Sequence, residues 1–335
     1  MSAPPPDPAA RQPGASVLVA RFLAFGDVLL TLPLVQTLHR SRAVRSVDVM
    51  TQRRFADLLV RSPYIRRVIT IDPKLGSDHH LDLDEYDVLL DLHTRAAPLD
   101  PAIENLLARV PARTRIGYAN PWERPGPGRL PTRGWDEHAV EYYARSAGDL
   151  IDGPLADGII DIAPADVAAA ADLLPPRAVC LAPGARFAFK RWPEERYAEL
   201  AGLLARQGIP TVLVGHSFDG AVIERVRAAS GATAMVIDDD YRLAAVLRAS
   251  GVAVCNNSGM MHLAQVAGAR VVCVHSHTLP AMWRPWGTGH VNITGEPGPC
   301  ACPGLTEFEL PVPCGRAIAA ETVADAVLGL LAARP

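Results

Sequence analysis

Residues 251–278, GVAVCNNSGMMHLAQVAGARVVCVHSHT, decide the fold class of this chain. The stretch predicts a buried strand at 252–255, a polar turn at 256–259, a helix at 260–266 and a second strand at 271–274. A strand–helix–strand unit of this kind belongs to a parallel α/β sheet. Its polar turn then lies at the carboxyl edge of the sheet, where open α/β folds bind ligands.

The predicted helix opens at Ser258 and Gly259. Its first turn would point free backbone N–H groups and the positive end of the helix dipole at the sheet edge, so an anion is the natural ligand. Asn257 and Ser258 are also ordinary helix caps in α/β proteins, and this is the purely structural interpretation. Taken alone, the stretch favours that structural interpretation.

Length and composition predict two domains. The chain has 335 residues, 49% of them hydrophobic and 21% charged, and its net charge of −3 gives no basis for nucleic-acid binding. No apolar run reaches the length of a membrane span, and residues 1–14 lack the apolar core of a signal peptide, so we expect a cytoplasmic protein with a disordered start. Three of the six cysteines, Cys180, Cys255 and Cys273, lie in strand-like runs and are expected to be reduced.

The chain begins its folded part with a predicted strand at 16–21, a loop, and an apolar helix at 28–39. The loop carries one glycine, not the three of a dinucleotide-binding fingerprint, so it does not indicate a nicotinamide or flavin site. Asp27 stands out as a carboxylate at the opening of a helix just after a parallel strand. Helix capping and a functional role explain Asp27 equally well at this point.

Alternating strands and helices along the rest of the chain predict doubly wound parallel sheets. In the first half we expect strands at 47–50, 68–71 and 86–92, helices at 55–61 and 102–109, and a long Gly- and Pro-rich loop at 117–134. In the second half we expect strands at 178–182, 211–214 and 234–237 and helices at 166–174, 194–207, 219–229, 242–248 and 319–333. The predicted divisions are a tail (1–14), a first domain (15–152), a linker (153–164), a second domain (165–316) and a C-terminal helical segment (317–335). Two such domains with facing carboxyl edges would leave a cleft between them.

Three loops of the second domain are expected at one sheet edge. The first carries Lys190 and Arg191 ahead of a helix, the second carries Asp219, and the third is the turn at 257–259. Cations suit phosphates, a carboxylate suits ribose hydroxyls, and a helix N-terminus suits a diphosphate. The combination predicts a site for a nucleotide diphosphate.

Four motifs occur in order along the chain. They are Phe25-Gly26-Asp27-Val28 with Pro33, Pro183-Gly184-Ala185 with Lys190-Arg191-Trp192-Pro193, Gly215 with Asp219, and Asn256-Asn257-Ser258-Gly259 with His262. Over roughly residues 16–333 the chain thereby resembles glycosyltransferase family 9, typified by ADP-heptose:lipopolysaccharide heptosyltransferases. The resemblance implies the GT-B fold, with a Rossmann-like acceptor domain followed by a Rossmann-like nucleotide-sugar donor domain. It also allows the C-terminal helix to pack back on the first domain.

The resemblance implies an inverting transfer from a nucleotide sugar to a hydroxyl acceptor, with no cofactor and no required metal. By motif position, Asp27 falls where the family has its general base, Lys190 on the donor diphosphate, and Ser258 and Gly259 at the phosphates. The other donor-site positions are Arg191, Asp219, Asn257, His262 and Thr278. Packing alone would also explain His262.

Three departures from the family pattern bear on the donor. Asn257 stands where the family usually has Asp, and Asp219 where it usually has Glu. Residues 275–280 keep only Thr278 and Pro280 of the usual Phe-Gly-Pro-Thr-Asp-Pro. The donor scaffold is kept while the sugar pocket is open to change, so ADP-heptose is the leading donor and no more than that.

The sequence gives weaker indications of the acceptor, and it leaves alternative functions open. Arg53, Arg54 and Arg95 are candidates for holding an anionic acceptor, although exposed arginines are most often only solvated. A lipopolysaccharide core or a small molecule such as a secondary metabolite would fit, and a lipid-linked acceptor would add a peripheral membrane contact. A catalytically silent nucleotide-sugar-binding protein stays open because of Asn257 and the altered residues 275–279. A GT-B-shaped sugar-nucleotide epimerase is disfavoured, since it would need further acid/base residues.

Two further motifs have simple structural explanations, and we expect no metal site. The aspartates at 238–240 lie between a strand and a helix, where turn and cap residues are ordinary. Cys300, Cys302 and Cys314 lack a standard zinc spacing, which favours a loop clasp or unlinked thiols.

Overall fold

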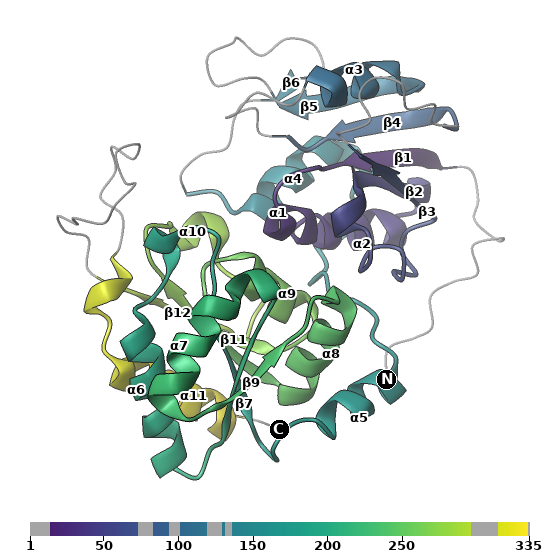
Figure 1. Cartoon of the computed structure of the whole chain (residues 1–335). Coiled ribbons are helices and arrows are strands. Elements are labelled where there is room, and N and C mark those ends of the chain that lie inside the picture. The colour runs from purple at the N-terminus through teal and green to yellow at the C-terminus, as the bar shows by residue number, and fades with distance from the viewer. Residues whose placement is uncertain are drawn as a thin grey trace. The chain divides into compact units, whose positions relative to one another are not determined.

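The computed structural model describes residues 14–72, 83–93, 101–118, 129–130, 136–295 and 314–333. The chain divides into two compact units, Met1–Asp161 and Ile162–Pro335, which are called here the first and second domains (Figure 1). The boundary falls inside the predicted linker segment, 153–164. Of the helices in the described ranges, none is both long and apolar enough to cross a membrane.

The described part of the first domain contains a six-stranded sheet in which every pair of neighbours is parallel, with the order β3-β2-β1-β4-β5-β6. Its strands are β1 (Ala15–Ala20), β2 (Val44–Gln52), β3 (Arg67–Ile71), β4 (Tyr86–Asp91), β5 (Ala112–Tyr118) and β6 (Arg129–Leu130). Its helices are α1 (Phe25–Leu29), α2 (Leu32–Arg40), α3 (Pro101–Arg109) and α4 (Ala139–Ala147), with short 3-10 turns η2 (Arg53–Phe55) and η4 (Gly148–Leu150).

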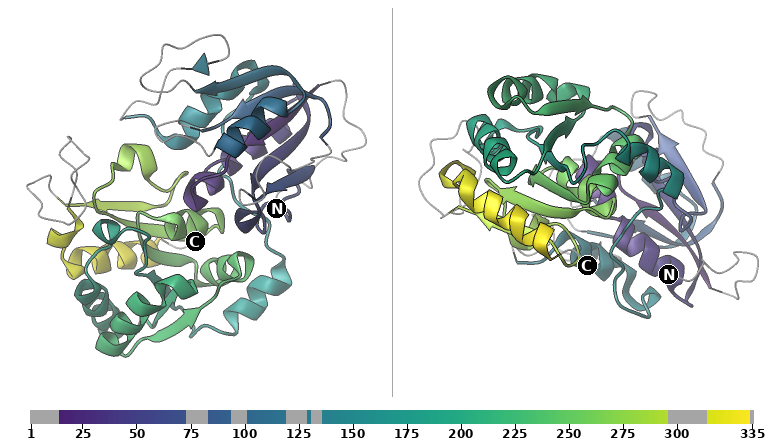
Figure 2. Two further views of the ribbon diagram at one scale, coloured as in Figure 1. Left: turned by 45° about the horizontal axis from the view of Figure 1, so that its top comes forward. Right: turned by 90° about the horizontal axis from the view of Figure 1, so that it is seen from below.

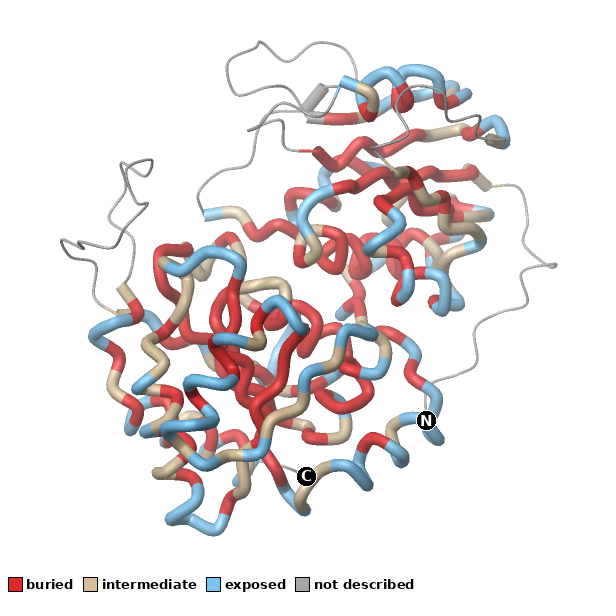
Figure 3. The backbone as a smooth tube through the Cα atoms, in the orientation of Figure 1, coloured by how far each residue is buried: buried red, intermediate tan, exposed pale blue. Residues whose placement is uncertain are grey.

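The core of the first domain follows the two-residue period of its strands. Leu18 and Ala20 of β1 share a buried cluster with Ile103 and Leu106 of α3, while α2 packs against β2. The buried strands form the centre of the domain in Figure 3. Helices thus cover the sheet and leave its strand ends for the loops.

Two predicted helices of the first domain were wrong in detail. The helix predicted at 28–39 is two helices, because Pro33, which has no N–H to donate, lies in the first turn of α2 and forces a restart after α1 ends at Leu29. The predicted helix at 55–61 is only η2 followed by turns. Ser62 precedes Pro63, and a residue before proline is disfavoured in the α conformation, so the turns do not extend into a helix.

The described part of the second domain also contains a six-stranded sheet of parallel neighbours, with the order β12-β11-β10-β7-β8-β9. Its strands are β7 (Val179–Ala182), β8 (Thr211–Gly215), β9 (Thr233–Val236), β10 (Val252–Asn256), β11 (Arg270–His275) and β12 (Val291–Thr294). Its helices are α5 (Pro164–Ala171), α6 (Glu194–Arg206), α7 (Gly220–Ser230), α8 (Asp240–Ser250), α9 (Gly259–Val266), α10 (Pro280–Trp283) and α11 (Ala320–Ala332), with 3-10 turns η5 (Ala188–Lys190), η6 (Ser217–Asp219) and η7 (Gly315–Ala317). The unit predicted at 251–278 is present as β10, α9 and β11.

Two groups of helices cover the second sheet. Contacts join α6 to both α7 and α11, and join α8 to both α5 and α9. Figure 2 shows α11 beside α6. The buried residues of α11, Val323 and Val327 among them, belong to the core of this domain. A contact of α11 with the first domain stays a prediction.

The two sheets have the same strand order when each is numbered from its own first strand, and it is the order of Rossmann folds that bind nucleotides. The predicted fold class, two Rossmann-like doubly wound domains, is confirmed. In each sheet the chain reverses its direction of winding between the first and fourth strands, which are β1 and β4 in one domain and β7 and β10 in the other. Ligands bind at such switch points, beyond the carboxyl ends of the strands.

Candidate active site

Asp27 lies just beyond β1, in the first turn of α1. Its Oδ2 atom accepts a hydrogen bond from the backbone N–H of Ala24 at 2.8 Å and lies 3.1 Å from Nη2 of Arg21. Its Oδ1 atom lies 3.5 Å from the hydroxyl oxygen of Tyr143 on α4. The side chain is 16% exposed. The capping contact that the sequence allowed is therefore present, and it uses only one of the two carboxylate oxygens.

Arg21 pairs with this carboxylate and is itself buried. Its Nη1 donates to the carbonyl oxygen of Leu92 at 2.7 Å, and its guanidinium lies 5.7 Å from the ring centre of Tyr143. Burial opposes the charged form of Arg21, but Tyr143, Asp27 and Asp91 outweigh that effect and raise its pKa. Arg21 could not be singled out from the sequence, because an arginine at the end of a strand has no distinctive pattern.

Asp91 and His93 form a second polar pair at the end of β4, on the other side of the switch point. Nδ1 of His93 lies 2.7 Å from Oδ1 of Asp91, and Nε2 of His93 accepts from the backbone N–H of Phe22 at 3.0 Å. Because Nε2 is the acceptor, the proton belongs on Nδ1 and the imidazole is neutral. The pair fastens the start of the β1–α1 loop to β4. The Asp-Leu-His spacing at a predicted strand end was the available signal for it.

Two of the three candidate acceptor arginines lie on the same sheet edge as the candidate base. Arg53 and Arg54 are exposed in η2, directly after β2, which neighbours β1. The guanidinium of Arg54 lies 4.5 Å from the ring centre of Phe55, which stacks on Phe25 of α1 at 5.9 Å. The third candidate, Arg95, lies outside the described residues.

In the second domain, one side chain of β10 shapes the loop that follows β7. The Asn256 Oδ1 atom accepts from the backbone N–H of Trp192 at 2.8 Å. Its Nδ2 atom donates to the carbonyl oxygens of Pro183 at 2.8 Å and Gly184 at 3.2 Å. The side chain is fully buried, so Asn256 has a structural role that its motif in the sequence does not indicate.

The predicted cation pair in this loop divides into two roles. Nε and Nη2 of Arg191 both donate to the carbonyl oxygen of Ala185, at 2.9 and 2.7 Å. This fork closes the loop on itself and gives Arg191 a structural contact, while its role in donor binding stays a prediction. Lys190, at the end of η5, is half-buried.

Asp219 is a buried carboxylate at the end of η6, after β8, and is 4% exposed. It packs against Gly184, where an added Cβ atom would lie 2.2 Å from the Asp219 carboxylate carbon. Its Oδ1 atom has no hydrogen-bond partner within the described residues. Burial raises the pKa of Asp219, against the charges of His216 and Arg191. A buried carboxylate oxygen of this kind is suited to a ligand hydroxyl group.

Ser258 and Gly259 are half-buried at the start of α9. The Ser258 side chain makes no capping hydrogen bond, and the first backbone bonds of the helix run from Met261 and His262 to the Ser258 carbonyl oxygen. Within the described residues, the N–H groups of Ser258, Gly259 and Met260 have no backbone partner. This is the arrangement by which helix N-termini bind anions. His262 is buried in the same helix, 4% exposed.

Asn257 and Thr278 belong to a buried network around His275. The Asn257 Nδ2 atom donates to Nδ1 of His275 and to the carbonyl oxygen of Trp283, both at 2.9 Å. Nε2 of His275 then donates to Oδ1 of Asn292 at 2.9 Å, and the Thr278 hydroxyl lies 3.4 Å from Nδ1. Burial lowers the pKa of His275 to about 4, although the Asn292 contact works in the opposite direction. Asn257 and His275, two residues that differ from the usual family pattern, are therefore joined by a hydrogen bond between neutral side chains.

The three aspartates at 238–240 each have a structural partner. Asp238 accepts from the Ser217 N–H at 2.8 Å, and Asp239 caps α8 by accepting from the Arg242 N–H at 2.9 Å. Asp240 lies 2.7 Å from Nε2 of His216. The predicted cap role is confirmed for Asp239, while Asp238 and Asp240 contact residues 216 and 217 of the loop after β8.

Four of the six cysteines lie in the described residues, and all four are free thiols. Cys180, Cys255 and Cys273 are buried free thiols, as predicted, and burial raises the pKa of Cys180 to about 11. Cys314 is a half-buried free thiol, and Cys300 and Cys302 lie outside the described residues. In the ranges that the structure describes, no three His, Cys, Asp or Glu side chains are grouped to hold a metal ion.

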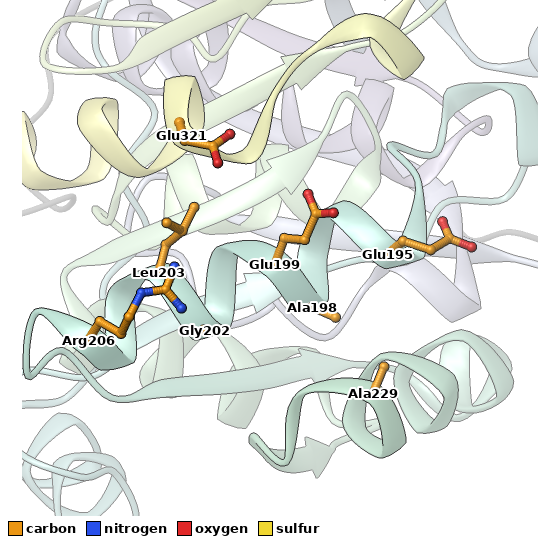
Figure 4. Close-up of a pocket in the computed structure, with 8 residues that line it drawn as sticks. All are labelled: Glu195, Ala198, Glu199, Gly202, Leu203, Arg206, Ala229 and Glu321. Atoms are coloured by element: carbon orange, nitrogen blue, oxygen red, sulfur yellow. The ribbon is translucent and has the colours of Figure 1, made fainter.

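A groove of about 480 Å³ lies between α6, α7 and α11 (Figure 4). Its lining residues are Glu195, Ala198, Glu199, Gly202, Leu203, Arg206, Ala229 and Glu321. The predicted donor-site residues are absent from this lining. The groove lies in the layer of helices that covers the sheet. Ligands of open α/β sheets bind instead beyond the carboxyl ends of the strands, at the switch point, where the predicted donor-site loops begin.

Comparison with solved structures agrees with this fold. A glycosyl transferase of family 9 from Veillonella parvula has a TM-score of 0.78 and 19% identity, over 96% of this chain and 98% of that one. Escherichia coli ADP-heptose lipopolysaccharide heptosyltransferase II has a TM-score of 0.71 and 21% identity, over 95% and 98%. Escherichia coli heptosyltransferase WaaC with ADP has a TM-score of 0.67 and 18% identity, over 94% and 99%. Two Rossmann-like domains of this topology define the GT-B class of glycosyltransferases.

The sequence is also matched by a family model. Residues 79–304 match glycosyltransferase family 9 (heptosyltransferase), which is more than half of the chain. The protein belongs to glycosyltransferase family 9. The comparison with curated proteins gives no match.

Proposed function

We propose that the protein transfers a heptose from ADP-heptose to a hydroxyl acceptor, with inversion at the anomeric carbon, without a metal ion, and with Asp27 as the general base. The observation that carries the proposal is the second-domain switch point. There, Lys190, the open N-terminus of α9 and the buried carboxylate of Asp219 lie on loops of one sheet edge. These groups suit a nucleoside diphosphate, with phosphates on the cation and N–H groups and a ribose hydroxyl on the carboxylate.

The reaction needs two kinds of assistance. The acceptor hydroxyl loses its proton as its oxygen bonds to the anomeric carbon, and the bond from that carbon to the diphosphate breaks. The Asp27 carboxylate takes the proton; its Oδ2 is held by Ala24 and Arg21, and its Oδ1 lies 3.5 Å from the Tyr143 hydroxyl. Lys190 and the N–H groups of Ser258 and Gly259 stabilise the charge on the departing diphosphate.

The remaining predicted residues support the site. Arg191 holds the loop that carries Lys190, and Asn257 with Thr278 builds the network beneath α9. Arg53 and Arg54 are exposed on the first-domain sheet edge and suit an acceptor with phosphate or carboxylate groups. Two similar structures are heptosyltransferases, one of them with ADP, which supports ADP-heptose as the donor.

The test compares Asp27→Asn with the parent protein in an assay that follows ADP release from ADP-heptose with a panel of hydroxyl acceptors. Asn still accepts from the Ala24 N–H but cannot take a proton, so turnover should fall by about 10²–10⁴-fold. ADP affinity, measured by calorimetry, should stay unchanged. Turnover within a few-fold of the parent would remove Asp27 from the base role, and a parent that binds ADP without transfer would favour a silent binding protein.

Asp48→Asn is the matched control. Asp48 is fully buried and paired with Arg66 at 2.7 Å, so this change also removes one carboxylate from an ion pair of the first domain. The Asp48 carboxylate is fully buried, but Arg66 is 47% exposed and also contacts Asp84, so the loss should stay below the about 3–5 kcal/mol that breaking a fully buried pair costs. Asp27→Asn likewise removes the carboxylate that faces Arg21. At a temperature where circular dichroism shows both variants folded, only Asp27→Asn should lose turnover.

A further inference from the structure

Phe218 is the most exposed of the large apolar side chains described, at 74%. Its ring lies over the imidazole of His216, with centroids 5.1 Å apart and planes 18° apart. The imidazole is held in turn by Asp240, 2.7 Å from its Nε2. An exposed phenylalanine alone needs no explanation. This ring, however, stacks on His216 with one face and is otherwise largely open to solvent.

The position of the ring ties it to the candidate donor site. Phe218 lies in η6, directly after β8, and its chain neighbour is Asp219, the buried carboxylate with an unpartnered oxygen. β8 is next to β7, whose loop contacts Asp219 through Gly184. A flat apolar surface and a buried hydrogen-bond acceptor thus come from consecutive residues.

We propose that Phe218, supported by His216, is the platform on which the base of the nucleotide donor stacks while Asp219 accepts a hydrogen bond from its ribose. This inference rests on the proposed function and adds a specificity-determining residue to it. A nucleoside combines a planar ring with vicinal hydroxyl groups, and these are the two complements that Phe218 and Asp219 offer. Purines have the larger ring surface, so the platform favours ADP over UDP.

The other exposed aromatic ring of this edge, Phe187, is directed to a different part of the loop. It stacks on Phe189 at 5.3 Å, and the Phe189 carbonyl oxygen accepts from the Ser276 hydroxyl at 2.9 Å. Phe189 also lies edge-on to His277, at 6.1 Å. These contacts lead toward β11, away from β8. Phe187 is therefore a matched control, an exposed stacked phenylalanine outside the proposed base site.

Calorimetry on the full chain tests the inference with two probes, ADP and inorganic pyrophosphate, which lacks a base. Phe218→Leu keeps an apolar side chain but removes the ring, and should weaken ADP binding by about 5- to 150-fold, the equivalent of 1–3 kcal/mol of base–aromatic stacking. Phe218→Tyr keeps the ring and Phe187→Leu spares the platform, so both should bind ADP within about threefold of the parent. Pyrophosphate affinity should be the same in all four proteins.

The proposed stacking role of Phe218 is wrong if Phe218→Leu binds ADP as tightly as the parent. It is also wrong if Phe187→Leu, and not Phe218→Leu, loses ADP affinity. Equal losses for ADP and pyrophosphate in Phe218→Leu also overturn it, because the ring would then act on the diphosphate or the fold. A parent that binds neither probe overturns the proposed donor site as a whole, which is a distinct result.

Discussion

Replacing Asn257 by Asp restores the residue that the family usually has at this position, yet we expect it to destabilise the protein. The Asn257 Nδ2 atom donates to the Trp283 carbonyl oxygen and to Nδ1 of His275, both at 2.9 Å. A carboxylate has the same shape but only acceptor atoms. In Asn257→Asp, an oxygen would therefore face two other acceptors in a buried site.

The size of the effect follows from the two lost hydrogen bonds. Each buried group left without its donor costs about 1–3 kcal/mol, so the free energy of unfolding should fall by about 2–6 kcal/mol at pH 8. The cost is relieved if His275 takes up a proton on Nδ1 and donates it to the introduced carboxylate. The loss should therefore shrink as the pH is lowered.

The parent should behave in the opposite way. Burial lowers the pKa of His275 from 6.5 to about 4 in the folded state, so the unfolded state binds the proton more tightly. The stabilising effect of the neutral imidazole is full above about pH 6.5 and decreases as the pH falls toward 4, by about 3 kcal/mol in all. Between pH 8 and pH 5, the variant and the parent should converge.

Urea titrations followed by circular dichroism at several pH values would measure this. Asn292→Asp is the matched control, because Oδ1 of Asn292 already accepts from Nε2 of the same His275 and the residue is exposed. It should stay within about 1 kcal/mol of the parent at pH 8. If Asn257→Asp is as stable as Asn292→Asp at pH 8, the donor role of the Asn257 amide is wrong.

Two further predictions concern the donor site. Lys190→Ala should weaken ADP binding by about 1.5–3 kcal/mol, the range for hydrogen bonds to charged groups, whereas Arg186→Ala, which removes an exposed cation of the same loop, should change it little. Calorimetry checks both, and unchanged affinity in Lys190→Ala would take that lysine out of the site. Transfer activity should also survive treatment with EDTA. Activity that is lost on chelation and restored by a divalent ion would contradict the proposed metal independence.

The fold could be predicted where the sequence has strong periodicity. Apolar strands such as those that became β1, β10 and β11 were found with small errors in their ends. β5 was missed because its sequence, ARTRIGY, alternates arginine with small residues and lacks an apolar run. β12, VNIT, was missed because only one of its four side chains, Ile293, is buried, so it has no apolar run. Strands whose side chains are partly solvated carry too little of the pattern on which the prediction depends.

The part of the candidate site that could be predicted from the sequence consists of residues marked by their type and by the order of the motifs. Asp27, Lys190 and Asp219 were named from the sequence, and the structure brings the latter two to one sheet edge. The groups that hold them were not predictable, because they are defined by tertiary contacts. Arg21 contacts Asp27 through the fold of one loop, and the contact of Arg191 with the Ala185 carbonyl oxygen depends on the shape of another.

The three hydrogen bonds of Asn256 have a consequence for how a donor would bind. They join the end of β10 to Trp192, Gly184 and Pro183, which lie 64, 72 and 73 positions earlier in the chain. The backbone of the β7 loop is therefore shaped by a neighbouring strand before any ligand arrives. A preorganised loop loses little conformational entropy on binding. Its contacts with a ligand can then contribute to affinity almost in full, and association requires no prior folding of the loop.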